Sequence, residues 1–443
     1  MDLNLEPPDH HLLTKTVFEA VRVTTASIGS PITRGADLVV KREEITAETS
    51  KEQDILILEN TAELARLHAP EAIVVNLTSI RTISEEYGPL SKRAVEQLEE
   101  IDALLGDLMR TLNSVYEDYL LLILSDHGMA PIKQHVDIFE VLDGVKAIVC
   151  HSRRSAHIYL VDRSELDEAL ERLISDDRFE LVLTRDNMAD YGLDNPRSGD
   201  LFAAVKEGYI LSPEELRGSS GGVSDKELMV FLMANKPEYA DIIEGADILA
   251  VVRAIKRYLL EARAIELVRR ELERADPAHD WRHTIRVLRM ATEIALRCKA
   301  DVEVVRLAAI FHDAKRYLGA EGHEEAGARL AEELLATEGA PRELVERVKK
   351  VILSHHAQRD ELATIEEQAL WEADKLEVLG LVGLARAILE EKDIEKGLER
   401  LLRRLRKYGS KISLPWAKEM AEKRVAVALR AARALKDELE GKA

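Results

Sequence analysis

The sequence predicts two parts, an α/β region followed by an all-helical region. Between residues 72 and 124, two apolar runs of strand length flank one long amphipathic segment, an arrangement typical of a parallel α/β unit. From residue 262 onward, nearly every apolar segment repeats with helical period. We therefore predict an α/β domain over residues 1–245, a linker or bridging helix over 246–261, and a helical domain over 262–443.

The composition indicates a multidomain protein without a membrane span. The 443 residues are 46% hydrophobic, enough for two or three cores, and no stretch reaches transmembrane length. A net charge of -20 argues against non-specific binding to nucleic acid or anionic membrane, so a phosphate substrate needs a local basic pocket. The two cysteines, Cys150 and Cys298, lie in different predicted domains and fit a reducing interior.

The sequence also carries weaker signals about location and source. Its start, MDLNLEPPDHH, lacks the basic and apolar regions of a signal peptide, and we expect a cytoplasmic protein. Many Glu, Lys and Arg residues with few Asn and Gln hint at a thermophile. Homo-oligomer formation stays open at this point.

Residues 1–70 carry the fewest structural signals. Leu38–Val40 and Ile55–Leu58 are interpreted as short strands, and Thr61–Leu67 as a helix. No Gly-rich phosphate loop occurs there.

The α/β pattern becomes clear at residue 72. AIVVNL (72–77) and YLLLIL (119–124) are predicted to be buried parallel strands, with a helix over 91–112 between them. In parallel sheets ligands gather beyond the carboxyl ends of the strands, which is where Asp126 and His127 lie. The remaining predicted elements are a helix over 165–174 and strands over 157–161, 179–184 and 200–205.

This region resembles the alkaline phosphatase superfamily, in particular its phosphodiesterase and nucleotide pyrophosphatase members. The resemblance rests on SDHGM after an apolar strand, on RSGDLFAAVKEGY and on GGVSDKEL, and it covers residues 71 to about 235. The family has an Asp and a His in a D-x-x-G-H-x-x-G-P motif, where this chain has Arg81 and Glu85. The family's metal-binding His before the GG pair is replaced by Ser220.

Only Asp126 and His127 of the two-metal set implied by this resemblance remain. The N-terminal segment also lacks the motif with the first metal Asp and the Thr or Ser nucleophile, and an Arg at a ligand position would repel a cation. We interpret residues 1–245 as a truncated, catalytically inactive relative with an interaction or regulatory role. The alternatives are residual metal binding at Asp126 and His127, or completion of the site by another polypeptide.

Residues 236–250 are interpreted as a linker, and residues 251–275 as a helix that Asp276-Pro277 ends. The basic run RLLRRLRKYGSK at 400–411 is interpreted as a solvated helix face, with contact to an anionic substrate as the alternative.

Six of the thirteen histidines fall between His279 and His356. His283 shares a predicted helical face with Val287, Ala291 and Ala295, and His312 lies in register with Val305, Ala308 and Ala309. His355 continues a stripe of Leu344, Val348 and Val351.

Asp374 shares its face with Leu370, Trp371 and Val378, a costly place for a carboxylate unless a cation neutralises it. Four such coincidences on four consecutive helices favour a metal site over isolated core histidines.

The order H, HD, D, supplied by His283, His312-Asp313 and Asp374, resembles the HD superfamily of metal-dependent phosphohydrolases. HDWRHTIRVLRMA, AAIFHDAKR and EADKLEVLGLVGLAR extend the resemblance over residues 262–443. It implies an all-helical domain that hydrolyses a nucleotide or other phosphate ester by means of a metal-activated water. Asp313 is, in this family, both a ligand and the residue best placed to orient that water, and Lys315 and Lys375 are candidates to neutralise charge on the phosphate.

Two imidazoles and two carboxylates favour Mn, Ni, Fe, Co or Zn, whereas Mg prefers an all-oxygen shell. His323, His355 and His356 are candidates for a second metal, as in some HD proteins, or for substrate contact. His279 is a candidate to orient a ligand.

Three functional hypotheses follow. The first is hydrolysis of a small phosphorylated substrate, with a nucleotide favoured. The second keeps the HD fold but uses a di-iron centre for oxygenation. The third is a non-catalytic metal or nucleotide sensor or scaffold.

Overall fold

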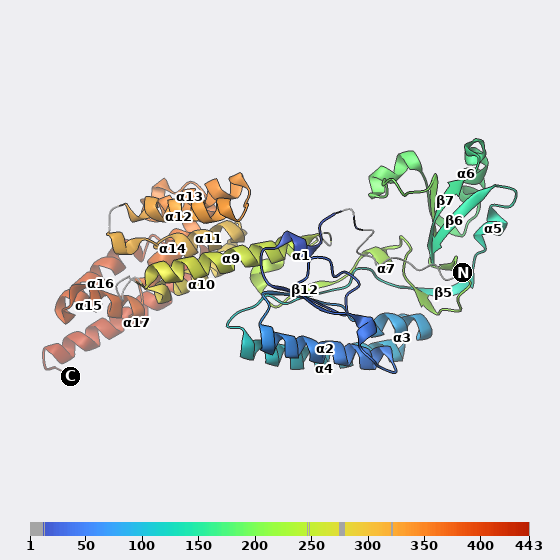
Figure 1. Cartoon of the computed structure of the whole chain (residues 1–443). Coiled ribbons are helices and arrows are strands. Elements are labelled where there is room, and N and C mark those ends of the chain that lie inside the picture. The colour runs from blue at the N-terminus through green and yellow to red at the C-terminus, as the bar shows by residue number, and fades with distance from the viewer. Residues whose placement is uncertain are drawn as a thin grey trace. The chain divides into compact units, whose positions relative to one another are not determined.

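The computed structural model in Figure 1 describes residues 12, 14–245, 247, 249–273, 280–319 and 322–442. The chain divides into two compact units, Met1–Asn235 (unit 1) and Lys236–Ala443 (unit 2). Unit 1 is α/β and unit 2 is helical, which confirms the predicted fold class. The predicted helix end at Asp276-Pro277 and the role assigned to His279 lie outside the described residues.

The first sheet of unit 1 has three parallel strands in the order β2-β1-β3, comprising β1 (Thr25–Ile28), β2 (Leu38–Val40) and β3 (Ala72–Val75). Helices α2 (Ser50–His68), α3 (Ser79–Tyr87) and α4 (Lys92–Val115) lie together on one side of this sheet (Figure 1). A core of Leu58, Ala65, Leu108 and Leu112 joins α2 to α4 and packs against β3.

Two expectations for this region are wrong. Ile55–Leu58 is not a strand but part of α2, which begins after the Thr49 cap and places Ile57, Thr61 and Ala65 on one buried face. The strands β3 and β4 (Leu122–Leu124) are not buried as predicted, since their residues are half-buried and Leu124 is 37% exposed. Among the described strands, β4 pairs with β12 (Leu232–Ala234), antiparallel and far along the chain, and not with β3. An apolar run does not identify the neighbouring strand.

A second, four-stranded sheet is antiparallel throughout, in the order β6-β7-β9-β8. Its strands β7 (Ser155–Leu160), β8 (Phe179–Thr184) and β9 (Leu201–Val205) confirm the three strands predicted here, and α6 (Leu166–Ser175) confirms the helix between the first two. The remaining elements of unit 1 are short: α1 (Val17–Ala20), β5 (Ala130–His135), α5 (Ile138–Val141), β6 (Ala147–Ser152), β10 (Gly208–Ile210), β11 (Gly218–Ser219) and α7 (Asp225–Leu228).

The GGVSDKEL run closes around a buried ion pair in unit 1. The guanidinium of Arg154 pairs with the carboxylate of Glu227, and the two side chains are 0% and 1% exposed. Glu227 also accepts hydrogen bonds from the Gly222 N–H (2.8 Å) and the Ser224 hydroxyl (2.7 Å). Gly222 leaves no room for a side chain, since a Cβ there would lie 2.5 Å from Glu227 Oε2. The run therefore has a structural role in this chain.

Unit 2 consists of helices around one large apolar core (Figure 1). Helix α9 (Ala250–Leu272), predicted in part as a linker or bridging helix, is continuous and contributes Ala264, Val268 and Leu272 to this core. The other helices are α8 (Ala240–Ile243), α10 (Trp281–Cys298), α11 (Val302–Phe311), α12 (His323–Thr337), α13 (Arg342–Ser354), α14 (Ile365–Glu377), α15 (Leu381–Glu391), α16 (Ile394–Tyr408) and α17 (Pro415–Leu439).

Residues 236–243, expected to be a linker, belong to the helical unit. The Arg257 guanidinium of α9 bonds to the Asp241 carboxylate at 3.1 Å and to the Glu238 carbonyl oxygen at 3.1 Å. Glu261 lies between Arg257 and Arg306 and binds both. These contacts hold the segment before α9 against α9 and α11.

None of the described helices combines the length and apolar character needed to cross a membrane.

Candidate metal centre

The candidate centre lies in unit 2, where the ends of several helices bring together the residues chosen from the sequence. His283 is in the first turn of α10, His312 and Asp313 follow α11, and Asp374 is in the last turn of α14. The side chains of His283, His312 and Asp313 are at most 7% exposed, and that of Asp374 is 14% exposed. The helical faces on which these residues were placed are thus buried, as the periodicity predicts.

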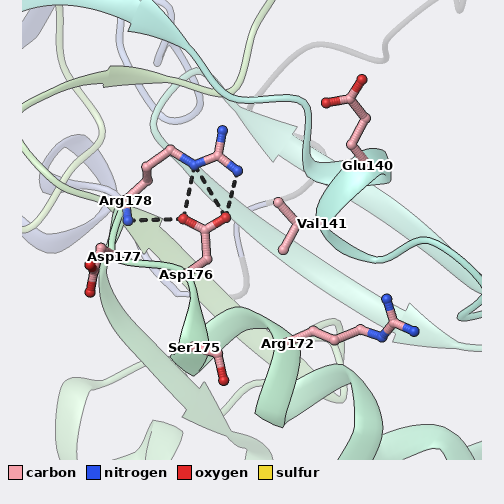
Figure 2. Close-up of a pocket in the computed structure, with 7 residues that line it drawn as sticks. All are labelled: Glu140, Val141, Arg172, Ser175, Asp176, Asp177 and Arg178. Atoms are coloured by element: carbon pink, nitrogen blue, oxygen red, sulfur yellow. Dashed lines mark hydrogen bonds and ion pairs between the residues drawn. The ribbon is translucent and has the colours of Figure 1, made fainter.

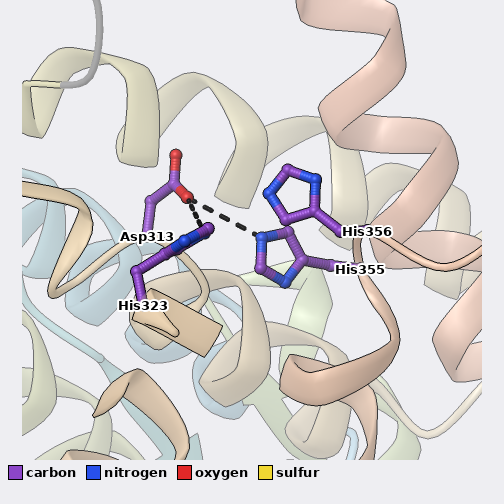
Figure 3. Close-up of side chains that lie close together, drawn as sticks. All are labelled: Asp313, His323, His355 and His356. Carbon is purple, nitrogen blue, oxygen red and sulfur yellow. Dashed lines mark ion pairs between the residues drawn. The ribbon is translucent and has the colours of Figure 1, made fainter. Parts of the chain in front are cut away.

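Asp313 lies at the middle of the cluster, with different partners for its two carboxylate oxygens. Oδ2 is 3.4 Å from His283 Nε2 and 3.8 Å from His312 Nε2. Oδ1 is 3.3 Å from His323 Nε2 and 3.7 Å from His355 Nε2. Figure 3 shows His323, His355 and His356 gathered beside this carboxylate. Asp313 therefore separates two groups of nitrogen donors and touches both.

Hydrogen bonds fix which ring nitrogen two of these histidines present to the cluster. His312 Nδ1 lies 2.8 Å from the Ala309 carbonyl oxygen, and His355 Nδ1 lies 2.6 Å from that of Ile352. A carbonyl oxygen accepts, so both Nδ1 atoms carry the proton and both Nε2 atoms present lone pairs. His355 Nε2 is buried without a hydrogen-bond partner and faces a carboxylate oxygen, an arrangement that a cation between them would satisfy.

The pKa shifts of His312 and Asp313 agree with a site that favours neutral imidazole and ionised carboxylate. His283 differs, because burial lowers its pKa but the hydrogen bonds to Asp313 and Glu377 outweigh burial and raise it. Burial, together with His283 and His355, lowers the pKa of His312 to about 4 despite the nearby Asp313. Burial raises the pKa of Asp313, but the surrounding histidines outweigh it and hold this pKa well below its ordinary value. Metals bind these same protonation states, so the residues fit a divalent ion.

Asp374, on α14, completes the first group, which comprises His283, His312 and Asp313. Its Oδ1 is 3.6 Å from His283 Nε2, and its Oδ2 accepts a hydrogen bond from Lys375 Nζ at 2.6 Å. Lys375 Nζ also donates to the His355 carbonyl oxygen at 3.3 Å. The ammonium expected to face phosphate is therefore committed to Asp374 here, and Lys315 is likewise bonded to Glu271 at 2.5 Å.

Replacing Lys375 with Met is expected to lower the free energy of unfolding of metal-free protein by about 3 kcal/mol, because it leaves a mostly buried carboxylate without its partner. Urea unfolding followed by tryptophan fluorescence measures this, since all three tryptophans, Trp281, Trp371 and Trp416, lie in unit 2. Lys423→Met, which breaks an exposed pair with Glu419, is the control and should have little effect on stability. Equal losses of stability in the two variants would contradict a role for Lys375 in holding Asp374.

His323, His355 and His356 form the second group with Asp313. His323 begins α12, and its Nδ1 lies 3.2 Å from Glu324 Oε2 and 3.1 Å from Arg316 Nη1. His356, whose side chain is 41% exposed, is the outermost of the three. The groups that could hold a metal among the described residues are this one and that of His283, His312 and Asp313.

The sequence analysis missed Glu377 and Arg386, which lie behind His283. Arg386 Nη1 is 2.9 Å from His283 Nδ1, and Glu377 Oε1 is 3.7 Å from the same nitrogen. Glu377 comes three residues after Asp374 on α14, so it shares that buried face. The apolar helical face that indicates Asp374 therefore also indicates Glu377.

The phosphatase-like residues of unit 1 do not form a comparable cluster. Asp126 has a side chain that is 78% exposed and lies 3.6 Å from His127 Nε2, and no third ligand joins them among the described residues. Arg81 and Glu85 pair with each other at 2.8 Å, and Glu85 also pairs with Arg153.

The carboxyl edge of the parallel sheet in unit 1 is filled by the protein's own charges. Arg42 Nη2 donates to the Asn76 carbonyl oxygen (2.6 Å) just after β3, and Arg42 Nε reaches the Gly29 carbonyl oxygen (3.4 Å) just after β1. Arg42 pairs with Asp54, which is 1% exposed and accepts from the Ser79 N–H at the start of α3. An internal ion pair thus lies at the carboxyl edge of β1 and β3, the edge at which α/β sheets commonly bind ligands.

A hollow of about 510 Å³ opens elsewhere on unit 1 (Figure 2). Arg178 within it bonds through its guanidinium to both carboxylate oxygens of Asp176, and Arg172 bonds to Glu168. With Glu140, Asp176 and Asp177 also in its lining, it offers no net positive charge for a phosphate.

Comparisons with known proteins assign a family to each unit. The model of the type I phosphodiesterase / nucleotide pyrophosphatase family matches residues 22–224, and the HD domain model matches residues 280–379. Over these two stretches the chain is similar to these two families. Both are metal-dependent and support a hydrolytic, phosphohydrolase-type function.

Individual relatives cover one unit or the other. The uncharacterized protein YpgQ of Bacillus subtilis is 27% identical over 176 residues, which are 37% of this chain and 85% of YpgQ. A predicted HD superfamily hydrolase from an uncultured Thermotogales bacterium is 30% identical, with 40% of this chain and 92% of that one aligned and a TM-score of 0.32. Murine ENPP5 is 16% identical, with 50% of this chain and 62% of ENPP5 aligned and a TM-score of 0.42.

Proposed function

We propose that unit 2 is a metal-dependent phosphohydrolase that cleaves a nucleotide or another small phosphate ester, and that unit 1 is non-catalytic. The observation that carries the proposal is the convergence of imidazole Nε2 atoms on the buried carboxylate of Asp313. His283, His312, Asp313 and Asp374 would hold the first ion. A divalent ion there would supply a Lewis acid and lower the pKa of a bound water.

The second group suggests a second ion. Asp313 presents one oxygen to the His283 side and the other to the His323 side, so it could serve both ions as a shared ligand. His323, His355 and His356 would complete this second shell. Imidazole-rich shells favour Mn, Fe, Co, Ni or Zn over Mg.

The residues themselves have distinct tasks in this proposal. Lys375 holds Asp374 in place, and the main-chain carbonyl oxygens of Ala309 and Ile352 hold the His312 and His355 rings with Nε2 toward the cluster. The burial of these side chains excludes bulk water from the donor atoms, which strengthens each electrostatic contact there.

The support for a non-catalytic unit 1 is the arrangement of charges at its sheet edge and around Asp126. Arg42 lies at that edge with its charge paired to Asp54. Asp126 is exposed, and among the described residues no third metal-ligand group joins it and His127. An interaction or regulatory role for unit 1 remains part of the proposal.

Phosphate release tests the function. Full-length protein is offered nucleotides and phosphomonoesters with added Mn, Ni, Co or Mg; ADP is included because YpgQ has been crystallised with it. We expect turnover that Asp313→Ala abolishes, a loss of at least about 1,000-fold, and that Asp126→Ala leaves intact. Loss only in Asp126→Ala would transfer the chemistry to unit 1. Metal binding without turnover would favour a sensor.

A second candidate function is oxygenation at a di-iron centre, which the four imidazoles around a shared carboxylate would suit. Protein loaded anaerobically with iron distinguishes it: oxygen uptake without phosphate release favours an oxygenase, and phosphate release without uptake favours the hydrolase.

A further inference from the structure

Behind His283, on the side away from Asp313, two buried groups of opposite hydrogen-bonding character face the same ring nitrogen. Arg386 Nη1 lies 2.9 Å from His283 Nδ1, and Glu377 Oε1 lies 3.7 Å from it. Residue exposures are 1% for His283, 1% for Glu377 and 6% for Arg386. A guanidinium can only donate and an ionised carboxylate can only accept.

These two groups call for different tautomers of the neutral ring. When Nδ1 accepts from Arg386, the ring proton is on Nε2, which then has no lone pair for a metal. When Nδ1 donates to Glu377, the proton leaves Nε2 free to bind. Nε2 is the atom that faces Asp313 Oδ2 and Asp374 Oδ1, at 3.4 and 3.6 Å.

The geometry also gives Arg386 an alternative partner. Its Nη1 is 3.9 Å from Glu377 Oε1, a short movement from hydrogen-bond contact, and its buried Nε has no hydrogen-bond partner among the described residues. Glu377 is already anchored by Arg286 Nε at 2.5 Å, so the carboxylate has a fixed position toward which Arg386 can move. If the guanidinium shifted from Nδ1 to Glu377, the ring could adopt the tautomer that binds a metal.

We propose that Glu377 is a positioning residue that holds His283 in its metal-binding tautomer, and that Arg386 competes by holding the other tautomer. The proposal rests on the proposed function, because it assumes a metal on His283. It assigns the two residues opposite effects on metal affinity, which a purely structural role would not give.

Titration calorimetry of metal-stripped, full-length protein with MnCl₂ tests this. Glu377→Gln is expected to weaken Mn binding about 10- to 100-fold. Arg386→Met is expected to tighten it, because the donor that holds the other tautomer is removed. The matched control is Glu372→Gln, which changes another fully buried glutamate of α14 that bonds to Ser413 and Leu414. This control is expected to bind Mn like wild type.

The outcomes separate the inference from the proposed function. If wild type binds no Mn, the proposed metal site fails and the inference fails with it. If wild type binds and Glu377→Gln binds equally well, or if Arg386→Met does not bind more tightly than wild type, the inference alone is overturned.

The position of the ring proton on His283 can be measured by NMR in the wild-type protein, so the result does not depend on whether Glu377→Gln or Arg386→Met folds. In ¹⁵N-histidine-labelled wild type, with His283 assigned by its loss in His283→Gln, Zn is expected to move the ring proton to Nδ1. A proton on Nε2 in the Zn-loaded protein would contradict the proposal.

Discussion

Addition of Mn to metal-free protein is expected to raise the melting temperature of unit 2 by roughly 5–10 °C for each ion bound. A ligand at 100 times its Kd stabilises the folded state by about 2.7 kcal/mol per site, and a unit of this size gains about 2–4 °C per kcal/mol. The stabilisation arises because the ion satisfies a buried nitrogen such as His355 Nε2, which has no hydrogen-bond partner among the described residues and lies 3.7 Å from Asp313 Oδ1. Differential scanning fluorimetry with intrinsic tryptophan emission reports on unit 2 alone.

Asp313→Asn is the decisive control for this rise. The amide keeps the shape but removes the charge shared by both donor groups, so the shift should disappear. His355→Ala should remove only the second group, and the Mn stoichiometry should fall from two to one. A full shift in Asp313→Asn would contradict a centre built on this carboxylate, and a stoichiometry of one in wild type would remove the second ion.

Arg154→Met is expected to destabilise unit 1 by about 3–5 kcal/mol, because it leaves the carboxylate of Glu227 buried without its cation. It also removes the donors that reach the Tyr209 and Val205 carbonyl oxygens at 3.1 Å. Hydrogen exchange followed by mass spectrometry should show faster exchange in peptides that contain β9 and β10, with unit 2 peptides unchanged.

The double variant Arg154→Met with Glu227→Leu tests the cause of that loss. Once both charges are gone, no unpaired ion remains, and part of the stability should return. The return will be partial, because the Gly222 N–H and the Ser224 hydroxyl lose their acceptor. A double variant that is less stable than Arg154→Met would show that packing around Gly222, rather than the charge, sets the cost.

Helical period was sufficient to predict the burial of His283, His312 and His355. His283 is on α10, and His312 and His355 directly follow the last residues of α11 and α13, so each continues an apolar helical face. It could not predict that Asp313 lies between two donor groups, because that depends on how α11, α12 and α13 meet. Arg386 was missed for a related reason. It is on α15, 103 positions from His283, and nothing local marks it as a partner.

In unit 1 the sequence predicted the positions of strands better than which strands pair with one another. The runs at 179–184 and 200–205 are strands, and their antiparallel pairing in β8-β9 is a tertiary property that apolar patterning does not encode. β1 was not predicted, because Thr25 and Ser27 interrupt its apolar character. Both residues are nevertheless buried, since Thr25 bonds to Asp37 and Ser27 bonds to the Ile32 carbonyl oxygen.

If unit 1 is non-catalytic, as proposed, the position of Arg42 bears on any attempt to build a metal site at the carboxyl edge of β1 and β3. Ligands added there would meet a fixed positive charge that is bonded to the carbonyl oxygens at the ends of both strands. Removing Arg42 alone would leave the buried carboxylate of Asp54, which also accepts from the N–H at the start of α3, without its cation. A metal site at this edge would therefore need Arg42 and Asp54 to change together.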